Sequence, residues 1–475
     1  MFEAAELGRT TGKADYDAAL PELRARLLAA QRELRGTRRP VIIVVSGVEG
    51  AGKSQVVNRL HEWLDARGLT THAFWRDSDE ETERPRYWRF WRALPARGTI
   101  GILFGSWYTQ PIIDRVFGRS RRADLDRDLQ RIAFFEQMLA DDGAVIIKLW
   151  FHLPEKEAKR RRKKGSVFGR FARMYDRFAT VSERAIRMTD TAAAPWRIVE
   201  ATDARYRDLT VGRIVLEVLE NLPRPAEKAA PAPASQEQTE SVLDKVDLSK
   251  KISDKKYERG LEKLQAEIAR LAWKAWNKRR STVILFEGWD AAGKGGAIRR
   301  LIAPIDARLY RVISVAAPTD EERARHYLWR FWRQLPRDGA MTLYDRSWYG
   351  RVLVERVEGF ARPEEWGRAY REINAFEEEL VEHGIVLVKF WLHIDKAEQL
   401  RRFEERQKIA FKQHKITDED WRNREKWDPY TLAVHDMISR TSSAIAPWTI
   451  VAANDKRLAR LQVLETVANS LRPED

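Results

Sequence analysis

Two glycine-rich segments of the 475-residue chain have the Gly-x-x-x-x-Gly-Lys spacing of a phosphate-binding loop. They are GVEGAGKS at 47–54 and GWDAAGKGG at 288–296. In such a loop the glycines let backbone N–H groups point at phosphate oxygens, the helix that follows adds positive potential, and the lysine supplies a full charge. Each segment lies between an apolar run and a helical stretch, so the residues predict phosphate binding, present or ancestral, in both places.

The second half of the chain also contains one acidic and two basic side chains that could support phosphoryl transfer. The segment YDRSWYGR at 344–351 supplies Asp345, Arg346 and Arg351. Phosphoryl transfer needs a carboxylate that holds magnesium and cations on the migrating group. Active sites of α/β folds lie beyond the ends of strands, which favours this role for Asp345 over a strand-end cap or an ion pair with Arg346.

The second loop also lacks the hydroxyl that usually holds magnesium. Gly295 stands where the first loop has Ser54. Carboxylates must then hold the ion, and Asp290 inside the loop and Asp345 at the strand end are available. We therefore expect Asp290 and Asp345 to bind Mg²⁺.

The first loop has the better motif but lacks the surrounding chemistry. Phe104 and Gly105 stand where the second half has its Asp-Arg pair, Gln110 replaces the later arginine, and Glu49 replaces the loop aspartate. A phenylalanine cannot bind magnesium, and a glycine cannot clamp a phosphate. We therefore expect only the second half to catalyse.

A basic and aromatic segment at 403–430 is a candidate lid. It includes Arg406 and Lys412 among several cations, and it resembles a helical lid that closes over phosphates and excludes water. The first half has only KRRRKK at 159–164, which is either a solvated face or a track for a polyanion. His393, at a strand end, is expected to be structural.

The elements that must position these residues occur twice. Gly47 matches Gly288 and Lys53 matches Lys294, a spacing of 241 residues that needs no gap from Tyr16 to His152. Further on, Pro195 matches Pro447 at a spacing of 252, so the second half contains 11 additional residues (252 − 241) between His393 and Pro447, where the candidate lid lies. A register kept over this length indicates two homologous domains.

Each repeat combines short apolar runs with helical stretches. The predicted strands are 41–46, 102–104, 144–153 and 197–200 in the first repeat and 282–287, 341–344, 385–394 and 449–452 in the second. The predicted helices are 21–34 and 55–66, then 261–276 and 297–302. Strands that alternate with helices predict an α/β fold with a parallel sheet wrapped by helices.

The segment PRPAEKAAPAPASQEQTES at 223–241 separates the repeats. It is rich in Pro, Ala, Gln and Glu, which is typical of an extended linker. We place the first, degenerate domain at 1–222, the linker at 223–241 and the catalytic domain at 242–475.

Composition narrows the class of protein. The chain contains no cysteine, which excludes disulfides and thiolate metal sites. It shows no membrane span and no signal peptide, so we expect a cytoplasmic protein. The formal net charge of +15 suggests an anionic partner: nucleic acid, an acidic membrane surface or a phosphorylated substrate.

Together these motifs resemble polyphosphate kinase family 2. The resemblance rests on GWDAAGKGG, PTDEERARHYLWRFWRQLPRDG, YDRSWYGRVLVERV, the candidate lid and APWTIVAANDKR over 261–461, with a weaker copy over 16–220. It implies a three-layer P-loop kinase fold in tandem, a helical lid on each copy, Mg²⁺ dependence and homo-oligomers. It also implies transfer of the terminal phosphate of inorganic polyphosphate to a nucleotide, most often AMP in fused members.

The resemblance also assigns roles to individual residues. Donor phosphates would be bound by Lys294 and by Gly288, Gly293, Gly295 and Gly296. Asp290 and Asp345 would hold the metal and orient the acceptor. The acceptor charge would be neutralised by Arg346 and Arg351, with Arg406 and Lys412 closing from the lid.

Other functions stay open at this point. The protein could be an ATP-dependent nucleotide or metabolite kinase, a polyphosphate-dependent kinase that converts ADP to ATP, or a P-loop protein that binds nucleic acid without catalysis. The sequence leaves undetermined the choice of AMP or ADP, base specificity, polyphosphate length, direction, oligomeric state and polyphosphate binding by the first domain.

Overall fold

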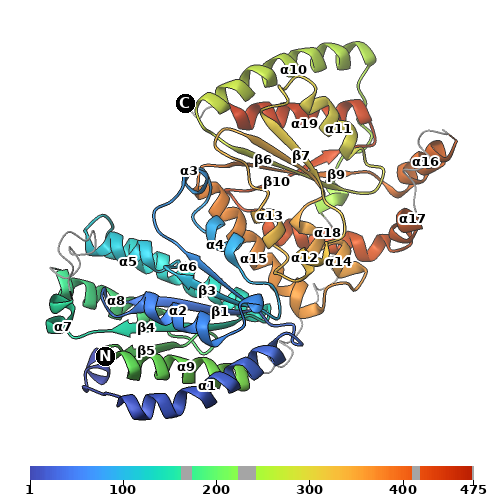
Figure 1. Ribbon diagram of the computed structural model, residues 1–475. Coiled ribbons are helices and arrows are strands. Elements are labelled where there is room, and N and C mark those ends of the chain that lie inside the picture. The colour runs from blue at the N-terminus through green and yellow to red at the C-terminus, as the bar shows by residue number, and fades with distance from the viewer. Residues whose placement is uncertain (162–173, 223–241, 409–417, 473–475) are drawn as a thin grey trace. The chain divides into compact units, whose positions relative to one another are not determined.

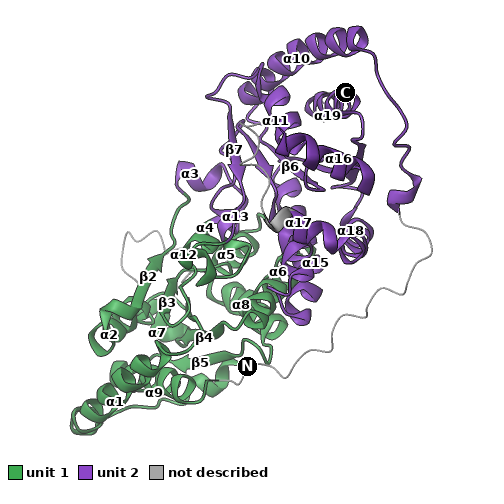
Figure 2. Ribbon diagram, turned by 90° about the vertical axis from the view of Figure 1, so that its right-hand side faces the viewer, with its two compact units in different colours: residues 1–77, 89–227, 318–329 green, residues 78–88, 228–317, 330–475 purple. Residues whose placement is uncertain are grey.

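The computed structural model describes residues 1–161, 174–222, 242–408 and 418–472 (Figure 1). The chain forms two compact units, each with one sheet and its own core. Unit 1 contains residues 1–77, 89–227 and 318–329, and unit 2 contains residues 78–88, 228–317 and 330–475 (Figure 2). Among the described residues, no helix has the length and apolar character that crossing a bilayer requires.

Both sheets have five parallel strands in the same order. Unit 1 contains β1 (Val41–Gly47), β2 (Leu69–Ala73), β3 (Ile100–Phe104), β4 (Val145–His152) and β5 (Trp196–Glu200), ordered β2-β3-β1-β4-β5. Unit 2 contains β6 (Thr282–Gly288), β7 (Tyr310–Ser314), β8 (Met341–Asp345), β9 (Val386–His393) and β10 (Trp448–Ala452), ordered β10-β9-β6-β8-β7. The predicted duplicated α/β fold with parallel sheets is confirmed.

Helices cover both faces of each sheet, which gives three layers. In unit 1, α1 (Lys13–Leu34) packs with α9 (Ala204–Glu220) on one face, and α6 (Arg122–Asp141) with α8 (Tyr175–Thr189) on the other (Figure 1). In unit 2, α10 (Asp254–Asn277) packs with α19 (Lys456–Leu471), and α15 (Pro363–Glu382) with α18 (Trp427–Thr441). Strand β4 is buried along its whole length, as expected for a sheet covered on both faces.

The edge strands β2 and β7 were not among the predicted strands. Their sequences, LTTHA and YRVIS, mix polar and apolar residues, and β7 is largely exposed. An edge strand has a neighbour on one side only, so it needs no continuous apolar run. Pairing of β7 with β8 from Tyr310 to Ser314 completes the sheet at this edge.

The first helix of each repeat starts earlier than predicted. Helix α1 begins at Lys13 instead of Pro21, and α10 begins at Asp254 instead of Leu261. The early turns are polar and mostly exposed, so they lack the apolar periodicity from which the prediction was made. Proline favours the first turn of a helix, but Pro21 lies inside α1.

A buried polar network repeats in the two cores. In unit 2, Lys389 Nζ donates to Glu377 Oε2 at 2.7 Å, to the Tyr349 hydroxyl at 3.0 Å and to the Thr441 carbonyl at 2.8 Å. The same arrangement in unit 1 joins Lys148, Glu136, Tyr108 and Thr189. Tyr349 also donates to Glu377 at 2.6 Å. The network therefore fixes the segment that follows β8, where the second set of candidate site residues begins.

The units contain matching segments from the opposite repeats. Residues 78–88 of the first repeat belong to unit 2, and residues 318–329 of the second belong to unit 1. The contacts also match: Arg84 Nε donates to the Leu335 carbonyl at 3.4 Å, and Arg325 Nε donates to the Leu94 carbonyl at 3.3 Å. Each repeat thus supplies an equivalent piece to the core of the other.

Candidate active site

The second glycine-rich loop joins β6 to α11 (Lys294–Ile302) at the carboxyl end of the sheet. Gly288 and Gly293 have φ angles of +147° and +112°, and a Cβ at Gly288 would lie 2.5 Å from the Leu392 carbonyl oxygen. Lys294 Nζ donates to the carbonyls of Gly288 at 2.8 Å and Trp289 at 3.2 Å. The loop therefore curls around the lysine ammonium, as the motif predicts.

Asp290 lies inside this loop and faces three polar side chains. Its carboxylate accepts from Asn423 Nδ2 at 2.8 Å and from Arg346 Nη2 at 3.2 Å, and Gln399 Nε2 donates to its carbonyl at 3.2 Å. Burial alone would raise the pKa of Asp290, but the charges of Lys294 and Arg346 and the Asn423 hydrogen bond outweigh it and lower that pKa. With 14% of its side chain exposed, Asp290 is a largely buried carboxylate that stays ionised at neutral pH.

Asp345 approaches the same loop from the end of β8. The strand pairs with β6, which places Asp345 beside Phe286. A Cβ built on Gly295 would lie 3.9 Å from Asp345 Oδ2. The carboxylate therefore lies close to the position where a serine hydroxyl would stand in the usual motif.

Arg346 follows with a backbone conformation that few arginines adopt. Its φ is +64°, and its N–H donates to the Phe286 carbonyl at 3.0 Å. The left-handed conformation costs a non-glycine residue about 1 kcal/mol or more and is concentrated at functional sites. Its guanidinium, 42% exposed, bonds to Asp290. The structure thus brings Asp290, Lys294, Asp345 and Arg346 together around one loop.

The remaining predicted residues have different surroundings. Gly296 lies in the first turn of α11, near Arg460. Arg351 ends the short helix η5 (Trp348–Arg351), with its Nε 3.2 Å from Glu355 Oε2. Arg406 lies near the end of α16 (Lys396–Gln407) and is half-buried. Lys412 lies outside the described residues.

Part of the predicted lid contacts the loop. The segment includes α17 (Asp418–Glu425), which carries Asn423, and the start of α18. The ring of Trp427 on α18 stacks on Trp289 of the loop, with centroids 3.8 Å apart and planes 9° apart. Trp289 Nε1 also donates to His393 Nδ1 at 3.0 Å. Burial lowers the pKa of His393 to about 4, so its neutral ring can accept this bond, in line with the expected structural role.

Sequence reasoning did not single out Glu287, a buried carboxylate at the end of β6. Ser347 Oγ donates to its Oε1 at 2.7 Å. Burial raises the pKa of Glu287, although the Ser347 hydrogen bond and the charges of Lys294 and Arg346 act in the opposite direction. The available signal was an acidic residue at the end of an apolar run, at a position where the first repeat has Ser46.

Sequence reasoning also missed Arg402, a buried arginine on α16 that holds the loop from behind. Its guanidinium donates to the carbonyls of Ala291 at 2.9 Å, Ala292 at 3.0 Å, Ala453 at 2.6 Å and Asn454 at 2.9 Å. Arg161 occupies the same place in unit 1 and donates to the Gly50 carbonyl. The 241-residue spacing continues from Arg161 to Arg402 and could have revealed it.

Unit 1 has the glycine-rich loop but not the aspartate and arginine that surround the loop of unit 2. Lys53 Nζ donates to the carbonyls of Gly47 at 2.6 Å and Val48 at 2.9 Å, and burial lowers its pKa to about 8 despite the nearby charge of Glu49. Glu49 is exposed, whereas Asp290 is largely buried. A Cβ at Gly105 would lie 2.6 Å from the Phe74 carbonyl oxygen, so this backbone leaves no room for an arginine side chain.

Comparison with known proteins agrees with the duplicated loop. The family model described as "Polyphosphate kinase 2 (PPK2)" matches residues 10–226 and 251–475. The chain is 50% identical to a polyphosphate:AMP phosphotransferase of Pseudomonas aeruginosa, covering 99% of this chain and 98% of that one. It is 37% identical to the protein of that name from Acinetobacter johnsonii, covering 94% and 95%.

A solved structure extends the similarity to three dimensions. The crystal structure of a polyphosphate kinase 2 from Pseudomonas aeruginosa PA01 matches with a TM-score of 0.90 at 50% identity. The match covers 99% of this chain and 98% of that chain. Both repeats are matched by the family model, and the relatives match over nearly their full length. The chain therefore belongs to the polyphosphate kinase 2 family.

Proposed function

We propose that this protein transfers the terminal phosphate of inorganic polyphosphate to AMP and releases ADP. The observation that carries the proposal is the convergence of Asp290, Lys294, Asp345 and Arg346 around one phosphate loop in unit 2. The names of relatives that share both repeats supply the donor and the acceptor.

In this mechanism the loop binds the donor. Lys294 and the backbone amides at 293–296 hold the terminal phosphates of the chain. An oxygen of the AMP phosphate attacks the terminal phosphorus, and the bond from that phosphorus to the bridging oxygen breaks. Arg346, which is half-exposed beside Asp290, neutralises charge on the transferring group.

The carboxylates fit a magnesium ion. Within the described residues, no three His, Cys, Asp or Glu side chains form a cluster that could hold a metal alone. Mg²⁺ commonly binds one or two carboxylates and takes its other ligands from water and substrate phosphates. Asp290, whose pKa is lowered, and Asp345 beside Gly295 suit this role. The bound ion would supply charge neutralisation on the donor and acceptor phosphates.

The helices α17 and α18 close the site. Asn423 orients Asp290 through the 2.8 Å hydrogen bond, and Trp427 covers Trp289. We propose that this segment shields the transferring phosphate from water, which would otherwise compete with AMP as acceptor. Arg406 and Lys412 remain predicted substrate-binding residues of the lid, and assembly into homo-oligomers also remains a prediction.

A donor and acceptor assay tests the proposal. The purified protein is incubated with polyphosphate, Mg²⁺ and each of AMP, ADP, GMP and GDP, and separately with ATP as sole donor. We expect AMP to be converted to ADP faster than ADP to ATP, and only with polyphosphate. Product formed only with ATP would identify an ordinary kinase. Salt-sensitive binding to nucleic acid without any product would identify a binding protein.

A further inference from the structure

Unit 2 contains a cavity at the opposite end of its sheet from the phosphate loop. It has a volume of about 820 Å³ and is lined at Tyr310 and Met341, the first residues of β7 and β8. The phosphate loop and Asp345 lie at the other ends of strands β6 and β8. The volume is within the range of small-molecule sites, and its position separates it from the transfer site.

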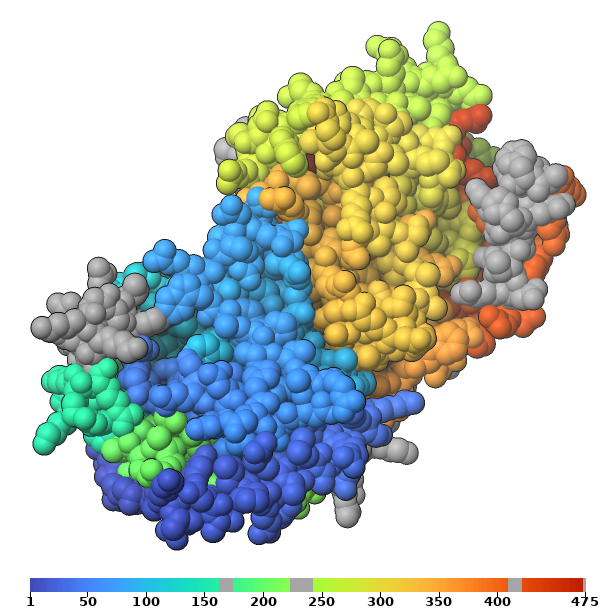
Figure 3. Space-filling view, in the orientation of Figure 1, coloured from blue at the N-terminus to red at the C-terminus, as the bar shows by residue number. Residues whose placement is uncertain are grey.

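Hydrogen bonds fix the wall of this cavity between α10 and β8. Gly339 N–H donates to Ser281 Oγ at 3.1 Å, and Ser281 Oγ donates to the Arg337 carbonyl at 2.9 Å. A Cβ at Gly339 would lie 2.8 Å from Trp276 Cα, so this turn passes close against the end of α10. The cavity is therefore bounded by ordered backbone. In the space-filling view, α10 (yellow-green) and the segment with β7 (yellow) are exposed on one face (Figure 3).

The lining is basic. It contains five arginines against the two carboxylates Glu83 and Asp338. Arg337 pairs with Glu83 at 2.5 Å and lowers the pKa of that carboxyl, so one carboxylate is already neutralised. In the described part of the chain, the side chains of Arg279 and Arg311 make no hydrogen bond or ion pair. An anion entering the cavity would therefore meet uncompensated positive charge.

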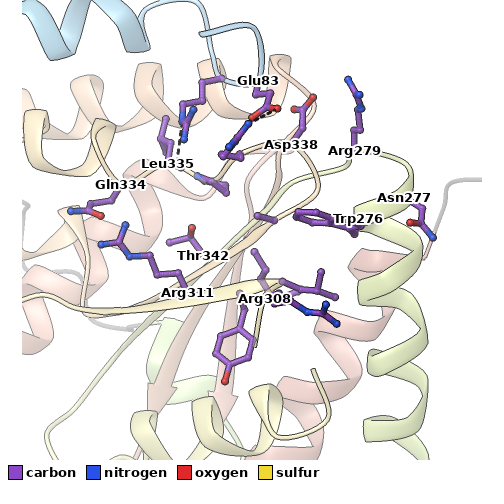
Figure 4. A pocket seen from close by; sticks show the side chains of 17 residues that line it. Glu83, Trp276, Asn277, Arg279, Arg308, Arg311, Gln334, Leu335, Asp338 and Thr342 are labelled. Carbon is purple, nitrogen blue, oxygen red and sulfur yellow. Dashed lines mark hydrogen bonds and ion pairs between the residues drawn. The ribbon is translucent and has the colours of Figure 1, made fainter. Parts of the chain in front are cut away.

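An aromatic ring lies beside this charge. The side chain of Trp276 is large and aromatic, yet the residue is 40% exposed to solvent. Its indole extends from α10 toward Thr342, and Arg311 lies on the other side of the space (Figure 4). A flat ring that can stack on a base, across the cavity from an arginine that can bind phosphate through two N–H groups, fits the two ends of a nucleotide.

The first repeat does not have these features. Arg35 and Arg97 stand where unit 2 has Trp276 and Asp338. Arg35 pairs with Asp65 at 2.7 Å, and Arg97 pairs with Asp142 at 2.8 Å. Both arginines are thus used within the protein, and the combination of an exposed ring with uncompensated arginines belongs to unit 2.

We propose that this cavity binds a nucleotide, with the base on Trp276 and the phosphates on Arg311, as a second site separate from the transfer site. The site would be completed by the first repeat, because Glu83 and Arg84 of residues 78–88 contribute to its wall. A degenerate first repeat would then be retained partly for this wall.

Binding stoichiometry tests the proposal in the full-length protein. Equilibrium dialysis with labelled ADP should give two sites per chain for the unaltered protein. Trp276→Ala and Arg311→Glu should each weaken the second site by about tenfold or more, whereas Trp276→Phe should retain it. Arg259→Glu, at an exposed position of α10, is the control for a change of surface charge. Initial rates with polyphosphate and AMP measured at low ADP should be unchanged, so failure of this proposal is distinguishable from failure of the transfer reaction.

Two results would overturn the nucleotide site. In one, both cavity variants bind ADP with the stoichiometry and affinity of Arg259→Glu. In the other, inorganic tripolyphosphate occupies the second site in a way that depends on Arg311 but not on Trp276, so that the ligand is a bare phosphate chain. Photolabelling with 8-azido-ADP and peptide mapping provides a direct readout, because label should reach α10 near Trp276 in the unaltered protein and not in Trp276→Ala.

Discussion

At the scale of single residues, the two phosphate loops differ through side chains that lie outside the shared motif. Lys53 and Lys294 make the same pair of hydrogen bonds to loop carbonyls. Only Lys294 has an aspartate in its loop that is buried and bonded to an arginine. We therefore propose that the capacity for phosphoryl transfer depends on Asp290 and on the residues that follow β8.

Asp345→Asn tests the metal assignment. The change keeps the shape of the side chain but removes the charge that would hold Mg²⁺, so we expect the rate of ADP formation to fall at least 100-fold, since metal stabilisation is worth several kcal/mol. Asp290→Asn should have a similar effect. Glu49→Gln, the matching change in unit 1, is the control and should keep its rate. A near-normal rate in either aspartate variant would mean that the metal is held elsewhere.

His393 gives a prediction about pH. Its pKa is lowered to about 4 in the folded protein, against about 6.5 when unfolded. Between these values the unfolded chain binds a proton that the folded chain does not, so the stability contribution is complete above pH 6.5 and is lost as pH falls toward 4. The loss is at most about 3 kcal/mol. Urea denaturation from pH 7 to 4.5 should show a smaller decrease for His393→Asn than for the unaltered protein or His383→Asn. Equal decreases would contradict a neutral buried His393.

At the scale of elements, helix α16 supports the phosphate loop through Arg402 and through Gln399, which bonds to the Asp290 carbonyl. Arg402 joins α16 to the loop and to the end of β10 by bonds to four carbonyls. Such a buried arginine is balanced here by Glu398. It is a positioning residue, because it holds loop carbonyls while the opposite face of the loop stays available for phosphate.

Arg402→Lys should damage both stability and binding of the donor. Lysine keeps the charge but cannot reach four carbonyls, so we expect a loss of about 3 kcal/mol in the free energy of unfolding. We also expect the KM for polyphosphate to rise by more than kcat falls. The neighbouring exposed Arg401 also pairs with Glu398, so Arg401→Lys is the matched control. Similar behaviour of the two variants would show that the loop does not depend on Arg402.

The sequence was sufficient to predict the fully buried strands and to locate the residues of the motifs. Strands β6 and β9 stand out as apolar runs, and the apolar residues that precede Asp345 are enough to place it at a strand end. Edge strand β7 could not be predicted, because half-exposed strands lack that signal. Arg402 was missed for a different reason. The 241-residue spacing from Arg161 marks its position, but its partners are carbonyls of distant segments, which a side-chain pattern does not report.

At the scale of the whole molecule, the repeats depend on one another because they exchange matching segments. Residues 78–88 carry Arg84, which bonds to the Leu335 carbonyl, and Glu83, which pairs with Arg337. Residues 318–329 carry Arg325, which bonds to the Leu94 carbonyl. The first repeat therefore contributes a segment to the core of unit 2.

The isolated second half should not form a stable folded monomer. Residues 242–475 alone lack the segment 78–88, so part of the core of unit 2 would be exposed. We expect this fragment to self-associate or unfold in size-exclusion chromatography with light scattering, and co-expression of residues 1–241 to restore a defined complex. A monomeric fragment with the thermal stability and the rate of the full chain would show that the exchange has no energetic weight.

We propose that phosphoryl transfer takes place in unit 2 alone. The most direct test is the steady-state rate of ADP formation from polyphosphate and AMP by Lys294→Ala and Lys53→Ala, each verified as folded by circular dichroism. Lys294 lies with Asp290, Asp345 and Arg346, so its removal should nearly abolish transfer. Unit 1 has Phe104 and Gly105 in the places of Asp345 and Arg346, and neither can stabilise a migrating phosphate, so removal of Lys53 should change the rate by no more than a few-fold. Comparable losses in two folded variants would contradict the claim and make unit 1 a second catalytic site.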